Sequence, residues 1–537
     1  MMTRTLALAL LIAAGAIAPA MAQMNVVVIL TDDQRFDTVG YMPSLSSLAA
    51  QGVTFNNAFA PTPLCAPNRS MFFSGGYRAQ NTGVLENGPP NGGAQVFNDH
   101  DNLGAMLQAQ GYRTEFVGKW LNNYEQMGNY VPPGWNRWVG RHSYAPSTSW
   151  SAFKYVIGAS TQAPSTGTIS ASGKYTADYE RDQILSFLDG TSSTNPFFIL
   201  WSPSAPHARA TPAAQDATLF SNWTYRGRGY GETDLSDKPS WVRLKTKADS
   251  DGFERNQLRS LQAVDRGIAA IVAKLKSQGR YDNTLIVFSS DNGYLWGEHH
   301  LWGKNAIYEE SIRVPFIVLM PGVTPRTDDS LVLPSLDLAA TILELAGISR
   351  QDDGQSLIPL LNGSAPAWRT EVALLAAESN RGGNAIWAAL RDDRWKYVRY
   401  WTGEEELYDL VNDPYELNSR HKDPALASLK TAMWSRVQPQ LGLAIIPTRS
   451  FPACGVGDKF SYQFKIWGGQ APFTWTLDSG ALPPGLTLNP STGQLQGVPK
   501  KIGTYTFAVR LTDSSQATQA GHARTYATRA LTLTVEP

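Results

Sequence analysis

The sequence predicts an α/β fold, in which a sheet lies between layers of helices, followed by a small antiparallel region and an appended β-sandwich. Short apolar runs alternate with helical patterns between residues 25 and 290, and strands that alternate with helices form layered sheets. Two strand-like segments then stand close together near residue 390. The tail after residue 446 is rich in Thr, Gly and Pro, with frequent turn signals that are typical of sandwiches.

Length and composition restrict the class of protein. The chain has 537 residues, whereas single cores stop growing at roughly 250–300 residues, so we expect more than one domain. The 46 basic residues cancel the 46 acidic ones, which argues against a nucleic-acid partner. The 2 cysteines exclude a disulfide framework and a cysteine-ligated zinc site.

The N-terminus has the pattern of a signal peptide. Arg4 precedes an apolar stretch at residues 6–18, which is shorter than the roughly 20 residues that span a bilayer. Residues 20–22 form an A-x-A cleavage site, so Gln23 should begin the mature chain. An uncleaved anchor is the alternative. We expect export to a periplasm or beyond, with no later membrane span.

Four apolar runs are each followed by polar, chemistry-bearing side chains. The runs cover Asn25–Thr31, Arg113–Gly118, Pro196–Trp201 and Thr284–Ser290, and they precede Asp32, Lys119, His207 and Asp291 respectively. Continuous apolar runs fit strands of a parallel sheet that is buried on both faces. Such sheets place their sites at the carboxyl ends of strands. The sequence therefore predicts one shared site. A helix is expected over residues 258–275, where apolar residues recur every three or four positions and Gly279 follows as a stop.

The remaining chain divides into two parts. Strands are expected at Ile386–Arg391 and Trp395–Tyr400, followed by a helix over Pro424–Val437. Alternating apolar residues from Tyr505 to Leu511 and a strand at Ala530–Val535 then favour a sandwich of immunoglobulin-like size. The expected organisation is a signal peptide at 1–22, a main domain at 23–445 and a β-sandwich at 446–537. Residues from about 375 to 445 form a small subdomain of the main domain.

Hard oxygen ligands follow two of the predicted strands. Asp32 and Asp33 follow the first strand, and Asp291 and Asn292 follow the last. Carboxylate and amide oxygens suit Ca²⁺ or Mg²⁺. With only 7 histidines in the chain, one cation is favoured over a pair of zinc ions, and an adaptable carboxylate site favours Ca²⁺ with Mg²⁺ as the alternative. Each Asp pair could also be a strand-end turn or helix cap.

Residues 63–70, PLCAPNRS, resemble the C-x-P-x-R core at which sulfatases have a cysteine oxidised to formylglycine. TDDQ at 31–34 precedes this core and SSDNG at 289–293 follows it, in the order found in the sulfatase branch of the alkaline-phosphatase superfamily. The resemblance covers residues 25–422. It implies an alkaline-phosphatase-like sandwich with a large central mixed sheet. GKWLNNY at 118–124 and VPPGW at 131–135 resemble the N-acetylglucosamine-6-sulfatase branch. Residues 482–513 resemble immunoglobulin-like repeats of bacterial exported proteins.

The resemblance implies a reaction, its cofactors and its partners. Cys65 would be converted to formylglycine by a formylglycine-generating enzyme. A hydrate oxygen would attack the sulfur of a sulfated carbohydrate or aryl sulfate, and the sulfated hydrate would then expel inorganic sulfate. One divalent cation, Ca²⁺ or Mg²⁺, would be held by residue 65 together with Asp32, Asp33, Asp291 and Asn292. Arg69, Lys119, His207 and Lys304 match the family's catalytic positions.

The sequence departs from the family pattern at three positions. Asn68 replaces a small residue between Pro67 and Arg69, and Ser74 replaces Thr or Ala. Leu121 stands where many arylsulfatases carry the histidine that eliminates sulfate. The elimination base is therefore open, with His207 as the substitute candidate.

Two other functions stay open at this point. A phosphonate or phosphate ester hydrolase of the same superfamily would use the same aldehyde, metal and cations. A catalytically dead glycan-binding surface protein would keep the scaffold without the chemistry. We also expect no disulfide between Cys65 and Cys454, because it would consume the catalytic precursor.

Overall fold

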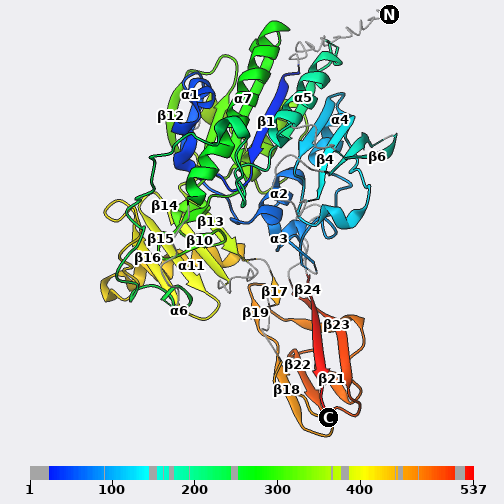
Figure 1. The fold of residues 1–537 in the computed structure, drawn as a ribbon. Helices are drawn as coiled ribbons and strands as arrows, with labels where there is room; N and C mark the ends of the chain where they lie inside the picture. The colour runs from blue at the N-terminus through cyan, green and yellow to red at the C-terminus, as the bar shows by residue number, and fades with distance from the viewer. Residues whose placement is uncertain are drawn as a thin grey trace, which may run out of the picture.

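The computed structural model describes residues 23–537 apart from 90, 144–153, 161, 169–173, 193, 244–251, 365–366, 377–385, 442, 446–450, 470 and 515–525. The predicted signal peptide at 1–22 lies outside the described residues. A ten-stranded sheet forms the centre of the molecule (Figure 1). Its strands, in spatial order, are β12 (Arg326–Val332), β2 (Val53–Ala58), β11 (Phe316–Leu319), β8 (Thr284–Ser290), β1 (Asn25–Thr31), β7 (Phe197–Ser202), β3 (Arg113–Gly118), β4 (Arg137–Ser143), β5 (Lys154–Ala159) and β6 (Gln162–Thr168).

The sheet is mixed, as the resemblance implies. The five central strands β8, β1, β7, β3 and β4 run parallel. β11 is antiparallel to both of its neighbours, and β5 and β6 add an antiparallel edge on the other side. The four predicted apolar strands are β1, β3, β7 and β8, which are neighbours in the order β8-β1-β7-β3.

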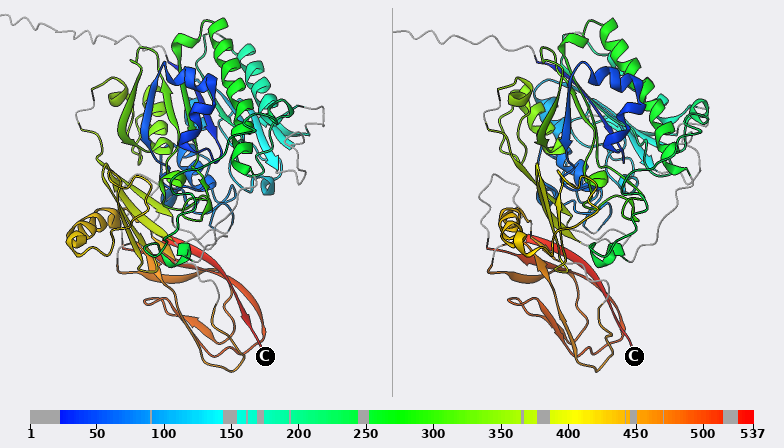
Figure 2. Two further views of the ribbon diagram at one scale, coloured as in Figure 1. Left: turned by 60° about the vertical axis from the view of Figure 1, so that its left-hand side comes forward. Right: turned by 90° about the vertical axis from the view of Figure 1, so that its left-hand side faces the viewer.

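Helices cover both faces of the sheet, because successive strand residues point to opposite sides. Along β1, Val26 and Val28 enter one core while Val27 and Ile29 enter the other. One face is covered by α1 (Pro43–Ala49), α5 (Thr176–Asp189) and α7 (Phe253–Ser277). The other is covered by α2 (Cys65–Phe73), α4 (Leu103–Ala109) and α9 (Pro334–Leu345). Figure 2 shows the helices on either side of the strands. The predicted helix at 258–275 lies within α7.

A small subdomain follows the main sheet. Its antiparallel strands are β13 (Glu371–Ala376), β14 (Trp387–Asp392), β15 (Trp395–Tyr400) and β16 (Glu405–Asp409), and α11 (Ala427–Val437) packs on them. Further short elements include α3 (Ala79–Thr82), α6 (Ser240–Arg243), α8 (Glu309–Ile312), α10 (Ile358–Leu361) and the hairpin of β9 (Leu295–Trp296) and β10 (Trp302–Gly303).

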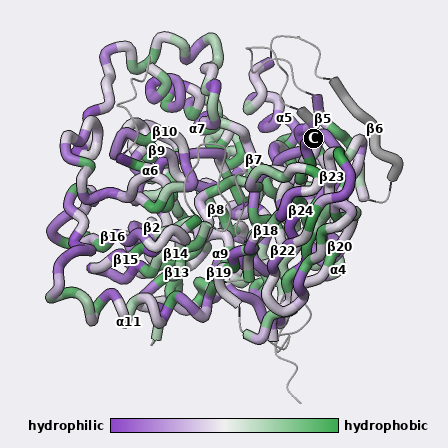
Figure 3. The backbone as a smooth tube through the Cα atoms, turned by 90° about the horizontal axis from the view of Figure 1, so that it is seen from below, coloured by the Kyte–Doolittle hydropathy of each residue, from purple (hydrophilic) through white to green (hydrophobic). Residues whose placement is uncertain are grey.

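The C-terminal region is a β-sandwich. Its strands are β17 (Ala444–Ile445), β18 (Phe460–Gln463), β19 (Ile466–Trp467), β20 (Thr474–Gly480), β21 (Leu486–Leu488), β22 (Gln494–Gly497), β23 (Gly503–Thr512) and β24 (Tyr526–Val535). Hydrophilic and hydrophobic residues are interspersed along β23 and β24 (Figure 3), and apolar residues of both strands enter a core around Trp475.

The sandwich contacts the subdomain through aromatic rings. The ring of Trp467 lies edge-on to Trp434 of α11, with 5.7 Å between the ring centroids. Cys454 is buried in the sandwich core, and both it and Cys65 are free thiols. No helix in the described part of the chain has both the length and the apolar character needed to cross a membrane.

Candidate active site

The predicted site residues meet at one edge of the central sheet. Asp32 and Asp33 follow β1, Lys119 follows β3 and Asp291 follows β8. These parallel strands are close neighbours, so their carboxyl ends lie at the same edge. Gly118 makes the close approach possible, because a Cβ there would meet the carbonyl oxygen of Ser202 at 2.1 Å. That oxygen instead accepts a hydrogen bond from the Lys119 amide at 2.8 Å.

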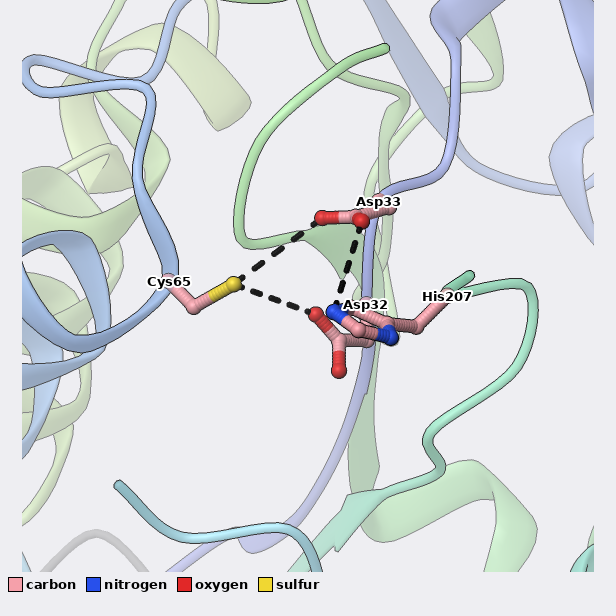
Figure 4. Close-up of side chains that lie close together, drawn as sticks. All are labelled: Asp32, Asp33, Cys65 and His207. Atoms are coloured by element: carbon pink, nitrogen blue, oxygen red, sulfur yellow. Dashed lines mark hydrogen bonds and ion pairs between the residues drawn. The ribbon is translucent and has the colours of Figure 1, made fainter. Parts of the chain in front are cut away.

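Cys65 is the first residue of α2, and its side chain points into this edge (Figure 4). The thiol is fully buried. Its Sγ lies 3.4 Å from Asp32 Oδ1 and 3.9 Å from Asp33 Oδ1. The Lys304 Nζ donates to the same sulfur at 2.6 Å. Cys65, at the start of a helix on one face of the sheet, therefore contacts the side chains that follow the strand ends.

Three carboxylates and three cations are paired around the thiol. Lys119 Nζ lies 2.6 Å from Asp32 Oδ2, and Arg69 Nε lies 2.7 Å from Asp291 Oδ2. Lys304 forms an ion pair with Asp33. The formal charges of the six side chains cancel. A divalent cation would therefore leave the centre with two net positive charges, which suits an anionic substrate.

Two neighbouring carboxylates belong to a group of side chains that could hold a metal ion. Asp32, Asp33, Cys65 and His207 form a group whose possible ligand atoms all lie within 4.8 Å of one another. Asp291 borders the group, since its Oδ1 accepts from the Asp33 amide at 3.1 Å.

Asn292 supplies the second indication of a cation. Its Nδ2 donates to Asp33 Oδ1 at 2.8 Å, while its buried Oδ1 has no hydrogen-bond partner among the described residues. A buried polar atom without a partner is costly. A cation on this oxygen would remove that cost.

Burial and charge shift the titration of the site. Burial raises the pKa of the Cys65 thiol, so the unmodified residue is a poor thiolate nucleophile. Burial also opposes ionisation of Asp32, but the neighbouring Lys119, His207 and Arg69 lower its pKa well below the usual value. Burial lowers the pKa of His207 to about 4, against the attraction of Asp32 and Asp33. The imidazole is therefore neutral at pH 7.

The site opens to solvent at two of its side chains. His207 lies 3.7 Å from Asp33 Oδ2, and its side chain is 22% exposed. The Lys304 side chain is 12% exposed. The paired side chains of Asp32, Arg69 and Asp291 have no exposed surface. Asp33 adopts a left-handed backbone with φ of +67°, a conformation that non-glycine residues adopt rarely and that clusters at functional sites.

The three departures from the family pattern have structural explanations. Asn68 is buried and its Nδ2 donates to the backbone oxygen of Asp291 at 2.5 Å. Ser74 is the C-cap residue that follows α2, and its Oγ accepts from the Tyr77 amide at 3.0 Å. Leu121 is buried in the core on the α2 side of the sheet, so position 121 supplies no base to the site.

Sequence reasoning missed several residues that hold the site together. The Ser202 Oγ accepts a hydrogen bond from Arg69. The Ser290 Oγ accepts from the Gln34 amide at 2.9 Å and bonds the Asn292 carbonyl at 2.9 Å. Arg35 forms a buried ion pair with Glu298 at 2.7 Å. Strand-end serines carry no distinctive signal, but Arg35 could have been noticed as a charge directly after the TDDQ motif.

Comparisons with known proteins match this geometry to one family. The model described as "Sulfatase" matches residues 24–348, which is more than half of the chain. The model described as "N-sulphoglucosamine sulphohydrolase, C-terminal" matches residues 297–441, and an Ig domain model matches residues 445–535.

Curated relatives carry sulfatase names. The chain is 30% identical over 464 residues to the N-acetylglucosamine-6-sulfatase of Capra hircus, covering 75% of this chain and 81% of that protein. It is 32% identical over 360 residues to the extracellular sulfatase SULF-1 homolog of Drosophila melanogaster, but covers 63% of this chain and only 31% of that longer protein.

Solved structures share the fold. One, determined in complex with its substrate D-glucosamine-2-N,6-O-disulfate, has a TM-score of 0.69 and 20% identity over 78% of this chain and 97% of that chain. The phosphonate monoester hydrolase of Agrobacterium radiobacter has a TM-score of 0.61 and 21% identity over 77% of this chain and 94% of that chain. These two likenesses show the fold alone. The matched family model and the goat relative show that the chain belongs to the sulfatase family, whose members are sulfuric ester hydrolases.

Proposed function

We propose that this chain hydrolyses a sulfate ester of a sulfated carbohydrate, using a formylglycine formed at Cys65 and one bound Ca²⁺. The observation that carries the proposal is the position of the Cys65 thiol, buried between Asp32, Asp33 and Lys304 at the strand ends. A thiol of raised pKa beside hard oxygen ligands is poorly suited to act as it stands. It is well placed as the precursor of an oxygen nucleophile.

Asp32, Asp33, Asp291 and Asn292 would hold the cation, together with residue 65. When bound, the cation would polarise oxygens and promote their ionisation. The formylglycine hydrate would supply the attacking oxygen. The proposed ligands are oxygen atoms, and carboxylates combined with an amide carbonyl are typical of Ca²⁺. Mg²⁺ is the alternative, and metal analysis of the purified protein distinguishes them.

The chain's own cations and histidine would carry the remaining roles. Lys119 and Lys304 would bind the sulfate oxygens, because fixed positive charges stabilise negative charge that develops in the reaction. Arg69 would orient Asp291 through their ion pair. A neutral His207 at the open side of the site could bind the ester oxygen. It is also the residue we propose to move the proton during sulfate release, since Leu121 is in the core.

A sulfated carbohydrate is the favoured substrate class. The goat relative is named an N-acetylglucosamine-6-sulfatase, and one neighbouring structure contains a sulfated glucosamine. An aryl sulfate would serve as a small test substrate. The shared fold with a phosphonate monoester hydrolase keeps a phosphonate or phosphate ester as the second candidate.

Maturation and location belong to the same proposal. A formylglycine-generating enzyme would convert Cys65. The chain would be exported after cleavage near Ala22, and relatives named extracellular sulfatases support export. Residues 23–445 would form the sulfatase domain and 446–537 the sandwich. β17 already pairs with β19 at Ala444–Ile445, so a truncation that leaves the sandwich unit out should end before residue 444.

Two measurements on one preparation test the proposal. Peptide mass spectrometry of the segment around Cys65 should detect the aldehyde, and the protein should release sulfate from p-nitrophenyl sulfate or a sulfated glucosamine. The Cys65→Ala variant is the control and should release none. Equal sulfate release by this variant would contradict the mechanism. A far higher rate on phosphonate monoesters would favour the second candidate. An unmodified thiol together with no turnover would favour the alternative that the chain is a catalytically dead glycan-binding protein.

A further inference from the structure

We propose that residues Trp223–Tyr230 form a subsite for a second anionic group on a glycan, next to the sugar whose sulfate is removed. The inference rests on the proposed function and specifies its substrate as a multiply charged glycan. The segment reads WTYRGRGY, so two arginines alternate with glycines between aromatic residues. Trp223, Tyr225 and Tyr230 are partly exposed, and Arg226 and Arg228 are exposed.

The aromatic residues of this segment are fixed in place. Trp223 Nε1 donates to Tyr41 Oη at 2.9 Å, and its ring lies edge-on to that of Trp296 with 5.8 Å between centroids. The Tyr225 hydroxyl donates to Glu298. The Arg35 guanidinium carbon lies near both rings, 5.0 Å from the centroid of Tyr225 and 4.4 Å from that of Trp296. Rigid aromatic rings offer binding area at a low cost in conformational entropy.

Short chain connections place the segment beside the catalytic centre. Arg35 follows Asp33 by two positions, so their Cα atoms lie within about 7 Å of each other. The guanidinium of Arg35 bonds the Tyr225 hydroxyl at 3.1 Å. On the other side, the His299 amide donates to the Gly229 carbonyl at 3.1 Å. That loop continues to Lys304, one of the two partly exposed side chains of the centre. The segment is therefore joined by hydrogen bonds to two chain segments that lead directly into the catalytic centre.

The two arginines provide the charge for an anionic ligand. The Arg226 guanidinium carbon lies 5.8 Å from the ring centroid of Tyr230, and that of Arg228 lies 5.3 Å from Tyr415. Among the residues that the structure describes, neither arginine forms a salt bridge. Arg226 donates one hydrogen bond to the carbonyl of Tyr225, and a guanidinium has five donors in all. Planar guanidinium groups recognise sulfate-like and carboxylate anions through paired hydrogen bonds.

The nearest acidic side chain along the chain does not neutralise these arginines. Glu232 pairs with the buried Lys238 at 3.1 Å and with His299 at 2.6 Å. The Glu232 carboxylate is thus paired with Lys238 and His299 rather than with Arg226 or Arg228. The segment thus places exposed arginines beside partly exposed aromatic residues. This combination suits a sugar that carries a sulfate or a carboxylate.

The test compares a multiply charged glycan with a small substrate. In Arg226→Gln/Arg228→Gln, kcat/KM for a heparin-derived tetrasaccharide should fall at least tenfold, while kcat/KM for p-nitrophenyl sulfate stays within twofold. The matched control, Lys500→Gln/Lys501→Gln, removes two exposed charges from the sandwich and should change neither value. Equal losses on both substrates, or an equal loss in the control, would overturn the subsite.

A binding measurement separates this inference from the proposed function. Calorimetric titration of the tetrasaccharide into the inactive Cys65→Ala variant needs no turnover. Adding the two arginine substitutions to that variant should weaken the Kd at least tenfold, and the salt dependence of binding should decrease. An unchanged Kd, or no measurable binding to Cys65→Ala, would contradict the subsite. Absence of sulfate release by the unsubstituted protein would instead count against the proposed function.

Discussion

Two buried clusters of charged side chains differ in a way that separates a reactive centre from a structural one. The catalytic candidate at the strand ends pairs Asp32, Asp33 and Asp291 with cations. The second cluster lies where α8 meets the subdomain. There, Lys396 donates to the Ile307 carbonyl at 2.9 Å and pairs with Glu309 at 3.1 Å.

Pairing is common to both clusters, so it does not identify the site. In the second cluster Lys396 also pairs with Glu416, and Arg391 pairs with Glu309 at 3.2 Å. What the catalytic candidate adds is a buried thiol among the charges and two side chains, His207 and Lys304, that reach solvent. The comparison teaches that a chemically convertible side chain and access to solvent, rather than buried charge, are typical of a site.

Replacing a charge in the catalytic centre should give the largest effect. Asp291→Asn keeps the size of the side chain but removes one carboxylate from the proposed cation site. Loss of several kcal/mol of stabilisation in the transition state corresponds to a decrease in kcat on the order of a thousandfold. The effect of Asp291→Asn is measured as the metal content of the purified variant and as its turnover at rising Ca²⁺ concentration. Normal metal content and normal kcat would remove Asp291 from the proposed ligands.

Replacing a charge in the second cluster should affect stability instead. Lys396→Met leaves Glu309 and Glu416 buried with one cation fewer, and breaking a buried pair costs about 3–5 kcal/mol. Denaturant unfolding should show this loss, while kcat per folded molecule stays near that of the unsubstituted protein. Lys430→Met, which removes a more exposed pair with Glu405, is the control and should cost less than about 1 kcal/mol. A large loss of kcat in Lys396→Met would contradict the distinction between a reactive centre and a structural cluster.

Glu180, a buried carboxylate outside both clusters, extends the comparison to a group held by neutral donors. Tyr155 Oη and Trp201 Nε1 donate to it at 2.9 and 3.0 Å. Burial raises its pKa from 4.5 to about 7. The folded state therefore binds the proton more tightly than the unfolded state, and this contribution to stability is full below pH 4.5 and is lost as pH rises through 7.

Glu180→Gln should remove that pH dependence. A difference of this size in pKa corresponds to about 3 kcal/mol, so the variant should match the unsubstituted protein near pH 4.5 and become the more stable one by pH 8.5. Unfolding free energies across this range provide the measurement. Parallel curves for the two proteins would mean that Glu180 is already ionised in the folded state at neutral pH.

The smallest effect is expected at Asn68, which touches the centre only through the Asp291 backbone. Asn68→Ser restores a small residue and removes one hydrogen bond, worth about 1 kcal/mol. It also removes the buried Oδ1 that has no partner among the described residues. We expect kcat to fall less than tenfold and stability to change by about 1 kcal/mol or less. A loss as large as that of Asp291→Asn would place Asn68 among the catalytic residues.

The sequence predicted the buried strands because their apolar character is local. β1, β3, β7 and β8 were recognisable from Val, Ile and Phe runs, and the motif order indicated the family. The edge strand β12, with sequence RTDDSLV, has polar residues where a core strand would be apolar. Its composition therefore does not identify it as a strand. β6, QAPSTGT, is equally polar.

The site residues that lie in recognisable motifs were predictable from the sequence. The residues that reach the site only through tertiary contacts were not. Position 121 illustrates the limit, because the sequence shows the missing histidine but not that Leu121 turns into the core. Ser202 and Ser290 act through contacts between strand ends that are far apart in the chain. Such contacts depend on strand order, which local patterns do not specify.

The burial of Cys65 has a consequence for the timing of its proposed conversion to formylglycine. In the folded protein its side chain has no exposed surface, and one of its covering groups, Lys304, lies 239 residues later in the chain. At 5–20 residues per second, synthesis of that interval takes roughly 10–50 s. If Cys65 is converted to formylglycine as proposed, the converting enzyme would have to reach the thiol before the chain closes over it. The rate of conversion in the cell, rather than the stability of the finished fold, would then limit the yield of active molecules.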